Sequence, residues 1–182
     1  MVVEKSESVM LRLREIAEKG FSPSAVTSYI RNPIQFYLQK IIRISQVDEV
    51  EENIAVNTLG TIIHETLFEM YKPFVGNTLK VEDIKALFPR IEKEVLNQFK
   101  LIYKEGDIQK GRNLLVFEVA KRNIHNFLNV ELDGLKNGDS VTILHLEERF
   151  VRTFEHPQLP FPVLIGGSVD RIEERNGKIR II

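Results

Sequence analysis

Apolar residues recur every three or four positions along the first two-thirds of the chain, which predicts a series of amphipathic helices. The expected helices are one that ends at Gly20, followed by 23–31, 33–42, 54–72, 81–104 (interrupted near Pro89) and 109–135. Ser22-Pro23 and Asn32-Pro33 each place a capping side chain before a proline, which favours a helix start. The acidic residues 46–53 predict a loop.

The predicted helix over residues 54–72 carries a stripe of apolar side chains at helical spacing, which we expect to be buried. The stripe consists of Leu59, Ile63, Leu67, Met70 and Phe74. Gly60 lowers helix propensity by about 1 kcal/mol relative to alanine. Its presence therefore indicates that another element approaches this helix closely.

The period of the pattern changes after residue 140, where strands begin. We expect strands over 141–151, over 163–174 and from 178 onward, with a proline-rich loop between the first two. Asn176-Gly177 is typical of a type I′ hairpin turn, because both central residues of that turn need positive φ. The sequence thus predicts an α+β fold in one domain, with a mainly helical part (1–140) packed on a small, mostly antiparallel β-meander (141–182).

The last residues, Ile-Arg-Ile-Ile, form an apolar strand without a polar tail. Such a strand needs a partner and normally continues into a turn. We therefore expect a partial domain whose sheet is incomplete and is cut within the return strand.

Composition narrows the possible chemistry. The net charge is −1, so no overall basic field indicates nucleic acid. The chain has no cysteine, which excludes disulfides, thiolate zinc sites and iron–sulfur clusters built from its own residues. No apolar run approaches the roughly 20 residues of a membrane span and no signal peptide is visible, so we expect a cytoplasmic protein without a membrane partner.

Asp170 lies on a predicted strand and shares a face with Gly166, Ser168 and Ile172. The glycines at 166 and 167 would allow a phosphate or another backbone to come close. Taken alone, the strand is more typical of a solvent-facing aspartate near a turn. Likewise, His64 taken alone is more typical of a structural histidine on an amphipathic helix. The other three histidines, His125, His145 and His156, are also expected to be structural.

Four segments in this order resemble the RecB/AddB-type branch of the PD-(D/E)XK nuclease superfamily. They are Phe21–Tyr37 with its Ser-Pro and Asn-Pro pairs, Leu59-Gly-Thr-Ile-Ile-His-Glu65, Leu146-Glu-Glu-Arg-Phe150 and Ile165-Gly-Gly-Ser-Val-Asp-Arg-Ile172. The resemblance covers about residues 21–182 and implies a restriction-endonuclease-like fold. It also implies a Mg²⁺ or Mn²⁺ site in which Asp170 and His64 bind the ion, with Asp170 and Glu147 as catalytic acids. A register shift of one residue would exchange Glu147 for Glu148.

Two departures from the family pattern matter. Many relatives carry a cluster-binding cysteine where this chain has Asn32, so we expect no iron–sulfur cluster. The family also continues into an Asp-x-Lys motif that supplies a second acid and a lysine, and this motif does not follow Asp170 here. Asp83-Ile84-Lys85 matches Asp-x-Lys only by chance at a helix start, and Lys178 lies too far along the hairpin.

Basic and aromatic side chains occur together on the two predicted entry helices. We expect Tyr29, Arg31, Gln35, Tyr37 and Lys40 to contact DNA by base stacking and phosphate binding. The alternative is that the aromatic residues belong to the core and the others are ordinary surface.

The sequence therefore predicts a metal-dependent DNA nuclease module of a helicase–nuclease involved in DNA repair and recombination. Its partners would be DNA, either single-stranded or a duplex end, and the helicase portion of the same parent chain or of a partner subunit. Because the second acid and the lysine are missing, these 182 residues are expected to be inactive alone. The alternatives are a catalytically silent nuclease-like scaffold or protein-interaction domain, and an unrelated helical DNA-binding domain.

Overall fold

The computed structural model describes residues 3–44, 54–103 and 110–182, and the predicted loop over 46–53 lies outside the described residues. The chain divides into two compact units. The smaller unit comprises Met1–Asp48 and Glu148–Val169, and the larger unit comprises Glu49–Glu147 and Asp170–Ile182. That they act as one domain stays a prediction.

The smaller unit begins with helices α1 (Glu7–Lys19), α2 (Pro23–Arg31) and α3 (Pro33–Phe36), which are followed by a π-helical turn, Tyr37–Ile41. The predicted caps are present. Ser22 Oγ accepts a hydrogen bond from Ala25 N at 3.1 Å, and Asn32 Oδ1 accepts one from Gln35 N at 3.1 Å. The prediction of 23–31 is confirmed, whereas the helix expected over 33–42 keeps α-helical geometry only to Phe36.

The two adjacent glycines of the β2 strand (Val163–Arg175) admit close neighbours within the smaller unit. A Cβ at Gly166 would lie 2.6 Å from the carbonyl oxygen of Phe150, and a Cβ at Gly167 would lie 3.1 Å from Pro23 Cδ. The sequence predicted that these glycines allow either a phosphate or another segment of backbone to come close. The structure places the protein's own chain there.

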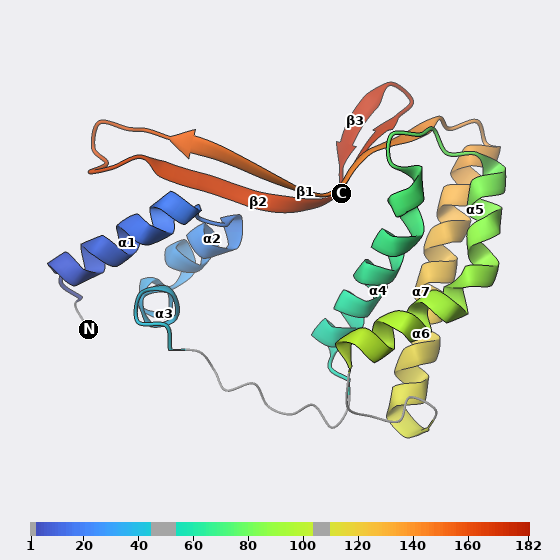
Figure 1. Cartoon of the computed structure of the whole chain (residues 1–182), viewed down its shortest axis with the longest axis horizontal. Coiled ribbons are helices and arrows are strands. Elements are labelled where there is room, and N and C mark those ends of the chain that lie inside the picture. Colours follow the sequence, from blue (N-terminus) through green and yellow to red (C-terminus); the bar gives the residue numbers. More distant parts are fainter. Residues whose placement is uncertain (1–2, 45–53, 104–109) are drawn as a thin grey trace. The chain divides into compact units, whose positions relative to one another are not determined.

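The larger unit contains helices α4 (Val56–Tyr71), α5 (Val81–Leu87), α6 (Ile91–Ile102) and α7 (Gly111–Lys136). Two 3₁₀ turns, Lys72–Phe74 and Phe88–Arg90, contain the prolines that interrupt the helical pattern. Helices α4, α6 and α7 pack against one another and enclose the core of this unit (Figure 1). No described helix has both the length and the apolar composition needed to cross a membrane.

The buried face of α4 is displaced from the predicted stripe. Met70 is fully buried, but Leu59, Ile63, Leu67 and Phe74 are only partly buried at the edge of the core. The fully packed positions are Ile62, Thr66, Met70 and Tyr71. The hydropathy pattern misses Thr66 because it is polar, yet its hydroxyl is satisfied within the helix by a 2.7 Å hydrogen bond to the Ile62 carbonyl.

Gly60 does not mark a close contact, so that expectation is wrong. A Cβ added at this exposed position would meet no atom of the described residues within 4 Å. A low propensity for the helix says only that the residue is unfavourable there, and does not reveal what surrounds it.

The sheet is open and antiparallel, with strands β1 (Val141–Phe154), β2 and β3 (Lys178–Ile181) in the order β1-β2-β3. Within the β2–β3 hairpin the register runs from Arg175 opposite Lys178 to Ile172 opposite Ile181. Asn176 and Gly177 have φ of 54° and 76°, which confirms the type I′ turn. The predicted α+β class is therefore confirmed.

Residues 76–79 of the larger unit pair with the start of β1, which the sequence did not predict. Thr78 and Thr142 form an antiparallel bridge, and their hydroxyl oxygens lie 2.7 Å apart. Leu79 N donates to the Val141 carbonyl at 2.8 Å, and Gly76 N donates to the Ile143 carbonyl at 2.7 Å.

Candidate metal centre

Three elements of the larger unit bring one histidine and two carboxylates together. His64 comes from α4, Glu147 from β1 and Asp170 from β2. The His64 Nε2 atom lies 2.8 Å from Glu147 Oε1 and 3.6 Å from Asp170 Oδ2. The sequence expectation that His64 and Asp170 lie close in the fold is thus confirmed, and Glu147, rather than Glu148, is the acid beside them.

The spacing of the three side chains suits a single divalent ion. One ligand atom from each residue can be chosen so that all three lie within 4.8 Å of one another. Adjacent ligands on an octahedral ion are separated by roughly 3 Å and opposite ligands by roughly 4 Å when metal–ligand distances are about 2.1 Å. Small side-chain rotations would therefore place all three atoms on one ion.

The exposure of these side chains also suits a site that takes up an ion from solution. His64 and Glu147 are each 34% exposed, and Asp170 is 63% exposed. Two oxygen ligands and one imidazole form a donor set that accepts Mg²⁺ and accommodates Mn²⁺ well. The other ring nitrogen, Nδ1 of His64, lies 3.5 Å from Glu65 Oε1.

Glu147 adopts a backbone conformation that is unusual for its residue type. Its φ is 52°, although it lies within β1 and is not a glycine. Left-handed backbone costs roughly 1–2 kcal/mol for a residue with a Cβ. Such strain collects at functional sites because the surrounding structure must hold it in place.

The cluster borders a small pocket that is otherwise apolar, with a volume of about 130 Å³. Leu67, Phe68, Tyr71, Phe127 and Leu146 form its apolar lining. Burial raises the pKa of Tyr71 well above its usual range, so its hydroxyl stays protonated. Among the described residues that line this pocket there is no lysine.

Several residues that the sequence singled out lie elsewhere. Asp83 Oδ2 accepts a 2.9 Å hydrogen bond from Lys80 N at the start of α5, so the Asp83-Ile84-Lys85 match belongs to a helix cap, as expected. Lys178 stands opposite Arg175 rather than near Asp170.

The predicted DNA-contacting residues all lie in the smaller unit, on α2, α3 and the π-helical turn. Arg31, Gln35 and Lys40 are exposed, and Tyr37 is half-buried. Tyr29 is 54% exposed and packs edge-on against the buried Phe36, with ring centroids 5.4 Å apart. Their role in binding DNA stays a prediction.

Arg171 is the residue near this centre that the sequence analysis gave no role. It lies in the Gly-Gly-Ser-Val-Asp-Arg segment directly after Asp170, and it is 6% exposed. The sequence did contain a signal for this position. An arginine within a predicted strand must face either solvent or buried carboxylates, and two glutamates follow Arg171 closely on the same strand.

Comparison with known proteins agrees with this arrangement. The sequence profile of the PD-(D/E)XK nuclease superfamily matches residues 20–182. The matched range contains His64, Glu147 and Asp170. No curated protein matches the chain.

Proposed function

Because the chain belongs to the PD-(D/E)XK nuclease superfamily, we propose that it is a metal-binding DNA nuclease module in which His64, Glu147 and Asp170 hold the divalent ion. The observation that carries this proposal is the convergence of those three side chains from α4, β1 and β2. Nothing in the local sequence requires residues so far apart along the chain to meet.

The residues fit Mg²⁺ or Mn²⁺ by donor type and by spacing. When bound, such an ion polarises a phosphate oxygen and lowers the pKa of a bound water. Glu147 and Asp170 supply negative charge that attracts the ion, and His64 supplies an imidazole nitrogen as the third ligand. The exposure of Asp170 leaves this side of the centre open to a phosphate group.

We also propose that these 182 residues bind metal but do not cleave DNA efficiently by themselves. The family motif Asp-x-Lys does not follow Asp170 in these residues, and no lysine is among the described residues that line the adjoining pocket. A lysine at that place stabilises the charge that develops on the phosphate, and catalytic groups that act as a unit cost orders of magnitude in rate when one is missing.

The finer features of the proposal rest on the RecB/AddB-like segments of the sequence. We propose that the module serves a cytoplasmic helicase–nuclease in DNA repair and recombination, with the helicase portion in the same parent chain or in a partner subunit. The exposed Arg31, Gln35 and Lys40, with Tyr29 and Tyr37, would contact the DNA strand.

The second candidate is a nuclease-like scaffold that binds other proteins and performs no catalysis. The observation that favours it is that the pocket beside the cluster has no lysine among its described lining residues. A scaffold has no need to retain a metal, so metal affinity separates the two functions.

The test measures Mn²⁺ binding to the full chain, with the concentration of free ion determined by electron paramagnetic resonance. We expect His64→Ala and Asp170→Asn each to weaken binding by at least about 10-fold, because each removes one of three ligands. Asp133→Asn is the matched control, since Asp133 is a carboxylate on α7 that is 70% exposed and lies outside the cluster.

Equal affinity of the two cluster variants and the unmodified chain would disprove the metal site and favour the scaffold. In the same preparation, DNA degradation with Mg²⁺ or Mn²⁺ should stay near background. Robust cleavage that Asp170→Ala abolishes would contradict the proposed inactivity of these residues alone.

A further inference from the structure

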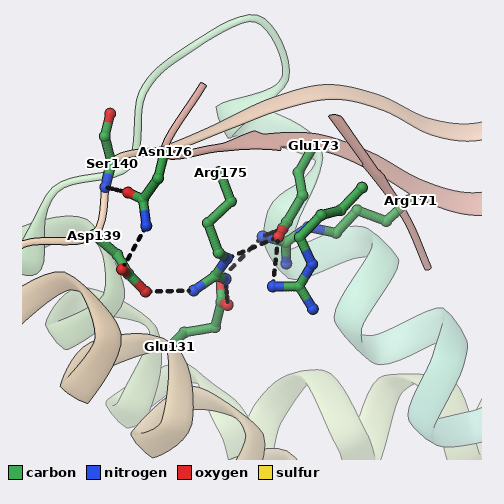
Figure 2. A network of polar contacts seen from close by, with 8 residues as sticks. Glu131, Asp139, Ser140, Arg171, Glu173, Arg175 and Asn176 are labelled. Carbon is green, nitrogen blue, oxygen red and sulfur yellow. Dashed lines mark hydrogen bonds and ion pairs between the residues drawn. The ribbon is translucent and has the colours of Figure 1, made fainter. Parts of the chain in front are cut away.

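A network of buried charges connects α7 to β2 within the larger unit (Figure 2). On β2, Arg171, Glu173 and Arg175 alternate along one face, and Glu131 of α7 reaches both arginines. The side chains of Arg171, Glu131 and Glu173 are 7%, 8% and 0% exposed. Arg175 Nη1 also donates to Asp139 Oδ2 at 3.0 Å, a contact drawn as a dashed line in Figure 2.

Arg171 is held from three sides. Its Nη2 atom donates to Glu131 Oε2 at 2.9 Å and lies 2.5 Å from Glu173 Oε2. Its guanidinium carbon lies 4.9 Å from the centre of the Tyr71 ring, which gives a cation–π contact. Its backbone exchanges hydrogen bonds with Ile182, at 3.2 Å and 2.9 Å, so the strand is paired at this residue.

These contacts join the two elements that carry metal-site residues. Arg171 directly follows Asp170 on β2. Tyr71 lies two helical turns after His64 on α4, and residues at that spacing lie on the same side of a helix. The pair Arg171–Tyr71 therefore connects α4 and β2 beside the place where His64 faces Asp170.

We propose that Arg171 is a positioning residue for the metal centre, fixing Asp170 of β2 at its distance from His64 of α4. The inference rests on the proposed function of the His64–Glu147–Asp170 cluster. Asp170 itself is largely exposed, so its own side-chain contacts restrain it little. An arginine buried between two buried carboxylates has few alternative conformations, because leaving any of these charges unpaired is costly.

Two polar atoms at this contact are deeply buried, the Nε atom of Arg171 and the hydroxyl of Tyr71. The two side chains also face each other through the cation–π contact. A change at either residue therefore disturbs a contact that lies inside the protein rather than at its surface.

The test compares two arginine variants of the same network in the full chain. Arg171→Met removes the arginine beside Asp170, and Arg175→Met removes the one at the far end, which contacts Glu131, Glu173 and Asp139 but not Tyr71. We expect Arg171→Met to weaken Mn²⁺ binding about 10-fold, as is typical for residues that orient metal ligands. Arg175→Met should stay within about 2-fold of the unmodified chain at a temperature where circular dichroism shows both variants folded.

Because removing a buried charge can unfold a protein, Tyr71→Leu provides an uncharged change at the same contact. It removes the ring under the guanidinium, and we expect a several-fold weaker Mn²⁺ affinity with the helical content retained. Mn²⁺ affinities for Arg171→Met and Tyr71→Leu equal to that of the unmodified chain, or an equal loss in Arg171→Met and Arg175→Met, would overturn the proposal.

A metal-free measurement separates this proposal from the proposed function. The imidazole resonances of His64 in a nuclear magnetic resonance spectrum report its surroundings without any ion. These resonances should change their chemical shifts in Arg171→Met and keep them unchanged in Arg175→Met. If the unmodified chain binds no Mn²⁺, the metal site fails. If the unmodified chain binds Mn²⁺ but Arg171→Met changes neither the His64 resonances nor the Mn²⁺ affinity, the positioning role fails.

Discussion

At the scale of single residues, Glu147 combines a proposed role as a metal ligand with an unfavourable backbone. Its carboxylate lies 2.8 Å from His64, while its φ of 52° belongs to the left-handed region. Metal binding and stability therefore make opposite demands at this position. A substitution at Glu147 can therefore change metal affinity and folding stability in different directions, so the two effects can be measured separately.

Replacing Glu147 with glycine should weaken metal binding without a matching loss of stability. Glycine adopts positive φ freely, which relieves roughly 1–2 kcal/mol of backbone strain, while its greater freedom in the unfolded chain offsets up to about 1 kcal/mol. We expect urea unfolding to change by no more than about 1 kcal/mol and Mn²⁺ affinity to fall at least about 10-fold. Glu148→Gly is the neighbouring control, and a large destabilisation by Glu147→Gly alone would show that the strain assignment is wrong.

At the scale of elements, hydropathy period was informative about where helices and strands run and less informative about what they contact. The helix expected over 23–31 has those bounds, and the turn at Asn176-Gly177 has the expected backbone. The stripe on α4 was displaced because Thr66 buries a hydroxyl that the helix itself satisfies. Pattern methods count such a residue as polar and shift the face accordingly.

Gly60 provides a test of this distinction. Because nothing lies within 4 Å of a Cβ at this exposed position in α4, alanine introduces no clash and gains helix propensity. We expect Gly60→Ala to increase the free energy of unfolding by up to about 1 kcal/mol, measured by urea denaturation. The matched change Gly177→Ala should do the opposite, because φ there is 76°. If Gly60→Ala instead destabilised the protein, the result would support the close contact at Gly60 that the sequence predicted.

At the scale of the whole molecule, the meeting of His64 with Asp170 followed from resemblance to a family and not from any local pattern. The sequence did not predict that Glu131 pairs with both Arg171 and Arg175. These residues stand on different elements, and charge alone does not say which carboxylate a buried arginine will find. Pairing of this kind depends on how α7 packs against β2, which a single sequence does not specify.

The predicted DNA contacts are also tested at this scale. Arg31 and Lys40 are exposed cations of the smaller unit, and each phosphate contact contributes to the salt dependence of binding. We expect Arg31→Ala and Lys40→Ala each to weaken binding of single-stranded DNA and to reduce the slope of log affinity against log salt by about 1. Lys85→Ala, an exposed cation on α5 of the larger unit, is the control. Unchanged slopes in both variants would assign these residues to ordinary surface.

The bridge between Thr78 and Thr142 determines how this sheet can grow. Residues 76–79 already occupy the outer side of β1 at its start, whereas β3 at the other end of the strand order exposes Ile179 and Ile181. Within the larger unit an added strand can therefore join next to β3, whereas the start of β1 is already paired. Two copies that met at β3 around a two-fold axis would each use the same edge, and their assembly would close as a pair rather than extend into a fibre.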